Sequence, residues 1–189
     1  GHVMAGGAAA APSYLSSPTG GEGTTPAIAQ GAGLRQVRPH EPVLVDFVFA
    51  IDGYLSDHAR IYAIGSLPDD LMRAQDAMIE VQEAVKNAAK PGVPAGELYT
   101  LALTKAESCG LGGYFMGVGE QRIRFVGHGV GLELDEFPFL AKGQAMALQS
   151  GMIIALEPKV VLPGRGVLGI ENTHLVTESG LFQLGRFFE

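Results

Sequence analysis

A hairpin signature in the first third of the chain constrains the fold most strongly. Two apolar runs rich in β-branched residues, PVLVDFVFAI and YLSDHARIYAIG, lie within residues 34–65 and are separated by Asp52-Gly53. An Asp-Gly pair between such runs is typical of a tight β-hairpin, because both turn residues must accept a positive φ. We therefore expect an antiparallel sheet whose hairpin turns at residues 52–53.

The same hairpin holds an acid where a buried apolar residue is expected. Asp46 lies within VLVDFVF, and a buried ionised carboxylate is costly unless it is paired or bound to a metal. With a two-residue turn, position 48 faces Asp57, and Asp46 shares a face with position 48. The two aspartates then point to one side as diagonal neighbours about 7–8 Å apart, near enough to share a cation.

The pattern returns near the other end of the chain. The runs IIALEPKVV and VLGIENTHLV each hold one acid, Glu157 and Glu171, among aliphatic residues. If the loop around residues 163–165 has an odd number of residues, position 162 pairs with 166 and Glu157 faces Glu171. An even loop would place the two acids on opposite faces.

Four inward-facing carboxylates in one sheet repel one another and need protons or cations. Each one alone can be satisfied by a backbone N–H, by an arginine such as Arg60, or by solvent. All four together, with His128 between two glycines in VGHGVGLELDE, favour two divalent ions, because two such ions neutralise four carboxylates. Oxygen ligands with one imidazole suit Mn, Co, Fe or Zn and do not choose among them.

Helical periodicity follows the hairpin. Apolar residues at steps of three and four from Leu71 to Ala88 predict a helix that Ser66 caps and Pro91-Gly92 end. A second helix is expected from about Ala95 to Cys109, and strands around 123–135, 151–162 and 167–177. The order of elements indicates one α+β domain at 34–189, preceded by a lead-in with the first strands at 1–33 that is rich in Gly, Ala and Pro.

Composition and net charge argue against some classes of binding partner. The 189 residues carry a net charge of −7 and a pI near 5.2, which argues against nucleic acid and anionic membranes as partners. No segment offers the roughly 20 mostly apolar residues of a membrane-spanning helix, and the single Cys109 excludes an internal disulfide. We expect a cytoplasmic protein, with a homodimer left open.

These residues resemble a known family. The set Asp46, Asp57, His128, Glu157 and Glu171 is similar to the five-ligand dinuclear site of the pita-bread metallopeptidases, which include methionine aminopeptidase, aminopeptidase P and prolidase. Four local motifs agree with it, at about residues 36–180, and are closest to the prolidase and aminopeptidase P branch: VDFVFAIDGYLSDHAR, VGHGVGLELDE, MIIALEPKV and VLGIENTHLVTESG.

The resemblance implies a curved antiparallel sheet backed by helix pairs, in two halves related by a pseudo-twofold axis. It also implies a first helix pair before the sheet and, in this branch, a separate N-terminal domain. Neither precedes the hairpin in this sequence, so we expect a fragment truncated at its N-terminus.

The resemblance implies a mechanism as well. Two divalent ions would hold a bridging water that attacks the scissile carbonyl of a short peptide near its N-terminus. Glu157 would be both a metal ligand and the group that takes and delivers the proton of that water. His128 would bind one ion only, with its other nitrogen held by a neighbour.

The sequence departs from this branch in the residues that contact the substrate. Two histidines are replaced by Arg124 and Asp135, which we predict to contact the substrate in their place. The alternative is that these two side chains pair with each other or with solvent. A third histidine has no counterpart in PAIAQGAG at 26–33, and the usual threonine of the hairpin motif is Ala59.

Three hypotheses compete. The first is a dinuclear metal-dependent peptidase of the Xaa-Pro dipeptidase or aminopeptidase type, based on the five ligand positions. The second is a non-catalytic or respecified peptide- or protein-binding module on the same scaffold, based on the missing histidines. The third, a metal-free hydrolase resembling creatinase, is disfavoured because that lineage generally lacks the ligand set.

Overall fold

The predicted hairpin forms the centre of a three-stranded antiparallel sheet. The computed structural model describes residues 2–13 and 17–185, and this sheet has the order β1 (His2–Ala5), β2 (Val43–Ile51) and β3 (Tyr54–Tyr62). The turn residues Asp52 and Gly53 have φ angles of 52° and 85°. Val48 lies opposite Asp57, as expected. The segment before residue 34 contributes β1, which places His2 opposite Asp46.

Six further strands form two more antiparallel sheets, of four and two strands. One has the order β4 (Gly127–Gly129), β5 (Ile153–Leu156), β8 (Asn172–Thr177) and β9 (Gly180–Gln183). The other pairs β6 (Lys159–Leu162) with β7 (Gly166–Gly169), and position 162 lies opposite 166 as predicted. The expected strands at 151–162 and 167–177 are therefore each divided in two, at residues 157–158 and 170–171.

The strand expected at 123–135 was wrong in length, because only residues 127–129 form β4. The chain beyond β4 turns back on itself, and the Gly129 N–H lies 2.9 Å from both the Glu136 and the Pro138 carbonyl oxygens. Residues 130–135 are thus part of a loop rather than an extended strand.

The two helices have the expected bounds. They are α1 (Asp69–Ala88) and α2 (Ala95–Ser108), and two short 3-10 helices, η1 (Gly6–Ala10) and η2 (Gly119–Gln121), lie elsewhere in the chain. Ser66 does not cap α1. Pro68 is at the N-cap and its carbonyl accepts the Leu71 and Met72 N–H groups, while the Ser66 carbonyl, two residues earlier, contacts the His40 ring.

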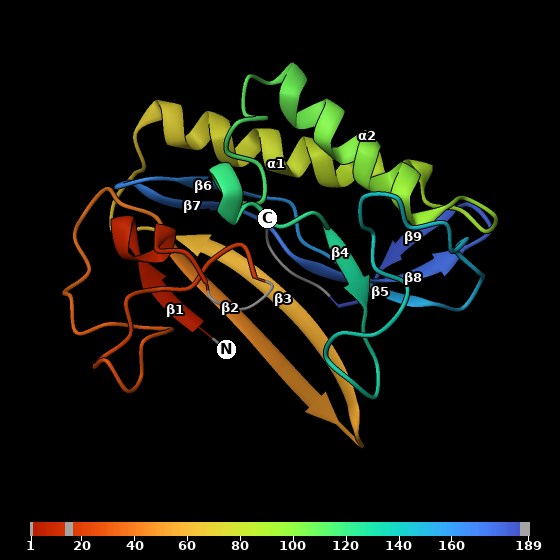
Figure 1. The fold of residues 1–189 in the computed structure, drawn as a ribbon, viewed down its shortest axis with the longest axis horizontal. Helices are drawn as coiled ribbons and strands as arrows, with labels where there is room; N and C mark the ends of the chain where they lie inside the picture. Colours follow the sequence, from red (N-terminus) through yellow and green to blue (C-terminus); the bar gives the residue numbers. More distant parts are fainter. Residues whose placement is uncertain (1, 14–16, 186–189) are drawn as a thin grey trace.

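The helices cover one side of the strands (Figure 1), and α1 packs on β6, β7 and β9. The main core lies between the inner faces of these helices and the strands. A smaller core under η1 joins β2, β3, β6 and β7 through buried residues such as Leu44, Val161 and Val167. The molecule is thus an α+β fold, as predicted. Neither described helix is long and apolar enough to cross a membrane.

The buried face of α1 gives the first testable prediction. Met78 is fully buried, whereas Met72 on the same helix is 48% exposed. Replacing Met78 by alanine leaves a cavity in the core, so M78A should lower the free energy of unfolding by about 2–5 kcal/mol. M72A should change it by no more than about 0.5 kcal/mol. Urea unfolding monitored by circular dichroism measures both variants, and equal losses would contradict the packing described.

Candidate metal centre

Hydrogen bonds between β3 and the segment that leads into β8 bring two of the predicted ligands together. The backbone groups of Ala59 and Glu171 are paired by two hydrogen bonds, of 3.2 and 3.1 Å. The Thr173 hydroxyl accepts from the Asp57 N–H and donates to the Asp57 carbonyl, both at 2.9 Å. The buried Arg60 guanidinium donates to the Glu171 carbonyl at 2.8 Å. These contacts hold Asp57 and Glu171 beside each other although the two are far apart in sequence.

Close backbone packing explains the glycines beside His128. A Cβ at Gly127 would lie 2.5 Å from the Ala155 carbonyl oxygen on β5, and one at Gly129 would lie 2.6 Å from the Phe137 carbonyl oxygen. Only glycine fits at both positions. The His128 Nδ1 is 3.0 Å from the Gly129 carbonyl oxygen, a contact that fixes the ring and leaves Nε2 as the nitrogen available to a metal.

All five predicted ligands line one cavity of about 410 Å³. Asp46 comes from β2, Asp57 from β3 and His128 from β4, while Glu157 and Glu171 lie at the strand breaks before β6 and before β8. The remaining lining residues are four apolar and four polar or charged side chains: Pro18, Val48, Phe125 and Leu134, and His2, Ser17, Gln30 and Asp135.

A lysine that sequence reasoning missed lies among the carboxylates. The Lys159 side chain is buried, and its Nζ is 2.7 Å from Glu157 Oε2, 2.6 Å from Glu171 Oε2 and 3.4 Å from Asp46 Oδ2. Burial alone would lower the pKa of Lys159, but the three carboxylates outweigh it and raise this pKa well above its usual value. Lys159 is therefore a fixed cation in the cluster.

The cluster keeps an excess of negative charge even with this lysine. Burial raises the pKa of Asp57 to about 6, with a further contribution from the Asp46 carboxylate. Burial also raises the pKa of Glu171 well above its usual value, and the neighbouring acids Glu157 and Asp57 add to this effect against that of Lys159. Such shifts mark a site that favours a further cation, because a cation would relieve the repulsion among ionised carboxylates.

Three of the predicted ligands are arranged to accept that cation. Asp57, His128 and Glu171 each offer one ligand atom, and these atoms lie within 4.8 Å of one another. The Asp57 Oδ1 atom is buried and has no hydrogen-bond partner among the described residues, which leaves it free to coordinate. Two carboxylates and an imidazole are ligands that Mn, Co, Fe and Zn all accept. The residues present therefore fit a divalent ion at this position.

The two predicted substrate contacts differ in position. Asp135 lines the cavity, and its Oδ1 lies 3.5 Å from His128 Nδ1. Arg124 is exposed and is not among the residues that line the cavity. The cavity lining also contains polar side chains that sequence reasoning left aside, namely His2, Ser17 and Gln30. Only the β1–β2 register, with His2 opposite Asp46, shows that His2 faces the carboxylates.

The remaining buried histidines belong to the core. Burial lowers the pKa of both His58 and His174 to about 4, so both rings are neutral near pH 7. Neither lines the cavity of the carboxylates, in agreement with the strand alternation that points them to the opposite face.

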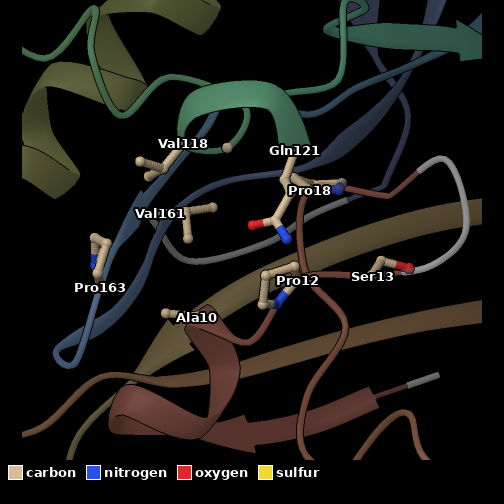
Figure 2. Close-up of a pocket in the computed structure, with 9 residues that line it drawn as sticks. Ala10, Pro12, Ser13, Pro18, Val118, Gln121, Val161 and Pro163 are labelled. Carbon is tan, nitrogen blue, oxygen red and sulfur yellow. The ribbon is translucent and has the colours of Figure 1, made fainter.

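A second pocket is of a different kind (Figure 2). It has a volume of about 240 Å³ and lies between η1, η2 and the end of β6. Its lining contains no titratable side chain: Ala10, Pro12, Ser13, Pro18, Gly117, Val118, Gln121, Val161 and Pro163. Because this pocket offers no titratable side chain as an acid, a base or a charged metal ligand, the cavity of the carboxylates is the candidate functional site.

The fold and this site define an α+β protein with a carboxylate-rich candidate metal centre, and comparisons with known proteins place it in a family. Residues 1–178 match the model of metallopeptidase family M24. The Xaa-Pro dipeptidase of Lactobacillus delbrueckii subsp. lactis is 35% identical over 151 residues, which are 80% of this chain and 39% of that protein. The chain therefore belongs to metallopeptidase family M24.

Solved structures agree with this assignment. The prolidase of Pyrococcus furiosus is similar with a TM-score of 0.81 and 28% identity, over 100% of this chain and 49% of that one. The dipeptidase PepE of Mycobacterium ulcerans has the same TM-score and identity, over 99% of this chain and 45% of that one. The pita-bread fold expected from the sequence is thus confirmed, and the chain spans less than half the length of these relatives.

The contacts of Thr173 give a prediction about the site. T173V removes the hydroxyl that satisfies both backbone groups of Asp57, so it should lower the free energy of unfolding by about 1–3 kcal/mol. T173S keeps a hydroxyl at the same place and should retain most of the stability. Urea unfolding measures stability in both variants, and a T173V protein as stable as T173S would contradict the role given to this hydroxyl.

Proposed function

We propose that this chain carries the catalytic centre of a metal-dependent peptidase of the Xaa-Pro dipeptidase or aminopeptidase type, acting on short peptides in the cytoplasm. The observation that carries the proposal is the meeting of five side chains from five separate segments around one cavity, in a chain of family M24. Relatives that bear the name Xaa-Pro dipeptidase support the substrate class.

The sequence-based expectation of five metal ligands, Asp46, Asp57, His128, Glu157 and Glu171, stays a prediction, and the geometry favours Asp57, His128 and Glu171 among them. A bound divalent ion supplies two things at such a site: a water of lowered pKa and polarisation of a substrate carbonyl. The sequence-based expectation of two ions, drawn from Mn, Co, Fe or Zn, stays a prediction. The ligand atoms of Asp57, His128 and Glu171, which lie within 4.8 Å of one another, support the binding of at least one.

Glu157 is the proposed acid–base residue. One of its oxygens, Oε2, accepts from Lys159 at 2.7 Å, while Oε1 lies 3.9 Å from His128 Nε2. Oε1 is thus the oxygen on the His128 side of the carboxylate, where it can accept a proton from a nucleophilic water and pass it to the leaving amine. The contact with Lys159 keeps the carboxylate in this orientation.

The cavity suits a short peptide with a free amino terminus. Val48, Phe125 and Leu134 provide apolar surface, and the Asp135 carboxylate provides a negative charge beside His128. We propose that Asp135 binds the α-amino group of the peptide, because a carboxylate accepts hydrogen bonds from an ammonium group. Arg124 is exposed and lies outside the cavity lining. A substrate-binding role for Arg124 therefore stays a prediction.

A second candidate is a peptide-binding module without catalysis. The observation that favours it is the hydrogen bonding of Lys159 to both Glu157 and Glu171, which withdraws one oxygen of each acid from a metal. The replacement of two histidines by Arg124 and Asp135 agrees with it. This candidate predicts binding of short peptides with no turnover under any metal.

Replacement of Glu157 separates the two candidates. With Mn or Co added, the chain should hydrolyse at least one peptide of a panel of Xaa-Pro and other dipeptides, and E157Q should lower kcat by about 10²–10⁴ because proton transfer is lost. E133Q, which alters an exposed acid absent from the cavity lining, is the matched control. Binding of the panel without hydrolysis by the unmodified chain would support the second candidate instead.

A further inference from the structure

The ammonium of Lys159 is fully satisfied by the acids around it. A lysine has three N–H donors, and Nζ lies within hydrogen-bond distance of three different carboxylates, those of Glu157, Glu171 and Asp46. Its side chain is only 2% exposed. No donor of this group is left for water or for another partner, so Lys159 acts in the cluster as a built-in cation.

The backbone and the aliphatic part of the Lys159 side chain are also held in place. The residue lies in β6 opposite Gly169, and a Cβ at Gly169 would lie 2.9 Å from the Lys159 Cγ. The Lys159 carbonyl also accepts the Met116 N–H at 2.9 Å. Because the backbone is paired on both sides and the stem passes over a glycine, the ammonium cannot leave the carboxylates without local repacking.

The carboxylate cluster is thereby divided into two parts. Asp46, Glu157 and one oxygen of Glu171 are bonded to Lys159, whereas Asp57, His128 and Glu171 form the group whose ligand atoms lie within 4.8 Å of one another. The Asp57 Oδ1 atom in this second group is buried without a hydrogen-bond partner among the described residues. The part around Lys159 already contains a cation, the ammonium group. The part formed by Asp57, His128 and Glu171 contains this carboxylate oxygen, which a metal ion can bind.

We propose that the Lys159 ammonium takes the place of one of two metal ions, so that this chain binds a single divalent ion, between Asp57, His128 and Glu171. Charge balance agrees with a single ion. Four ionised carboxylates with Lys159 and one divalent ion leave a net charge of −1. This small residual charge is stabilised by the nearby imidazole and by solvent. Two divalent ions with Lys159 give +1 and place the ammonium against a metal ion, which like-charge repulsion disfavours.

This inference concerns the number of ions and does not depend on peptide hydrolysis. A mononuclear centre is compatible with the proposed peptidase and with the peptide-binding module. Metal counting needs no substrate, so a failure of the inference and a failure of the proposed function are observed in different experiments.

Metal stoichiometry tests the inference directly. The unmodified chain is titrated with Mn²⁺ and with Co²⁺ by calorimetry, and the metal content is measured by elemental analysis after gel filtration. We expect one ion per chain. A content of two ions per chain, or no binding at millimolar metal, would overturn the proposal.

Removal of the ammonium should restore a second metal position. K159M keeps an unbranched side chain of similar length without charge, and we expect it to bind two ions per chain. K86M is the matched control, because Lys86 pairs with Glu83 on α1 outside the cluster, and it should still bind one. A K159M protein that binds one ion would show that Lys159 does not set the stoichiometry.

Replacing the buried lysine also destabilises the chain, because it leaves carboxylates without a counter-ion. Variants of the metal ligands provide a second test in which Lys159 is retained. D57N and H128N should weaken binding of the single ion at least tenfold, since even indirect supports of a metal ligand cost about 10–100-fold. D46N should weaken it less, because Asp46 is bonded to Lys159 and is not one of the three residues whose ligand atoms lie within 4.8 Å of one another. An equal loss in D46N and D57N would overturn the assignment of the ion to Asp57, His128 and Glu171.

Discussion

The buried ion-pair network around Lys159 is the interaction on which the rest of this structure depends. Three carboxylates from three segments share one ammonium, and a buried charge is tolerated only when it is paired and hydrogen-bonded. The network therefore requires β2, β6 and the segment before β8 to meet at one point. The backbone pairing of Ala59 with Glu171 provides that meeting, and the packing of α1 on β6 and β7 keeps it in place.

The same network organises the site chemically. Lys159 holds one oxygen of Glu157 and one of Glu171, and both residues line the cavity together with His128. Asp57, which lacks a partner for one oxygen, completes a group of ligands around a single point. Membership of family M24 explains why these residue types occur together. In this chain the Lys159 ammonium neutralises part of the negative charge of the carboxylates and so competes with a metal ion for them.

Local patterns predicted the fold well where they were strong. Asp52-Gly53 between two apolar runs predicted the hairpin and its register, because a two-residue turn leaves one pairing that buries the apolar face. Helical periodicity predicted α1 and α2 almost to the residue. The strand expected at 123–135 was wrong because glycine-rich sequence carries little periodicity. The cap expected at Ser66 was wrong because Pro68 already fixes the start of α1.

The sequence by itself determined which acids lie on one face of a strand and in what order the five predicted ligands follow one another. These properties depend on side-chain alternation and turn length, which are local. Only the tertiary structure decided that Lys159 lies among these acids, that Asp135 lines the cavity while Arg124 does not, and that His2 faces Asp46. The physical reason is that these outcomes depend on how separate strands meet. A lysine within the apolar run EPKVV signalled a buried charge, but its partners became visible only when β6 and β8 were placed beside the hairpin.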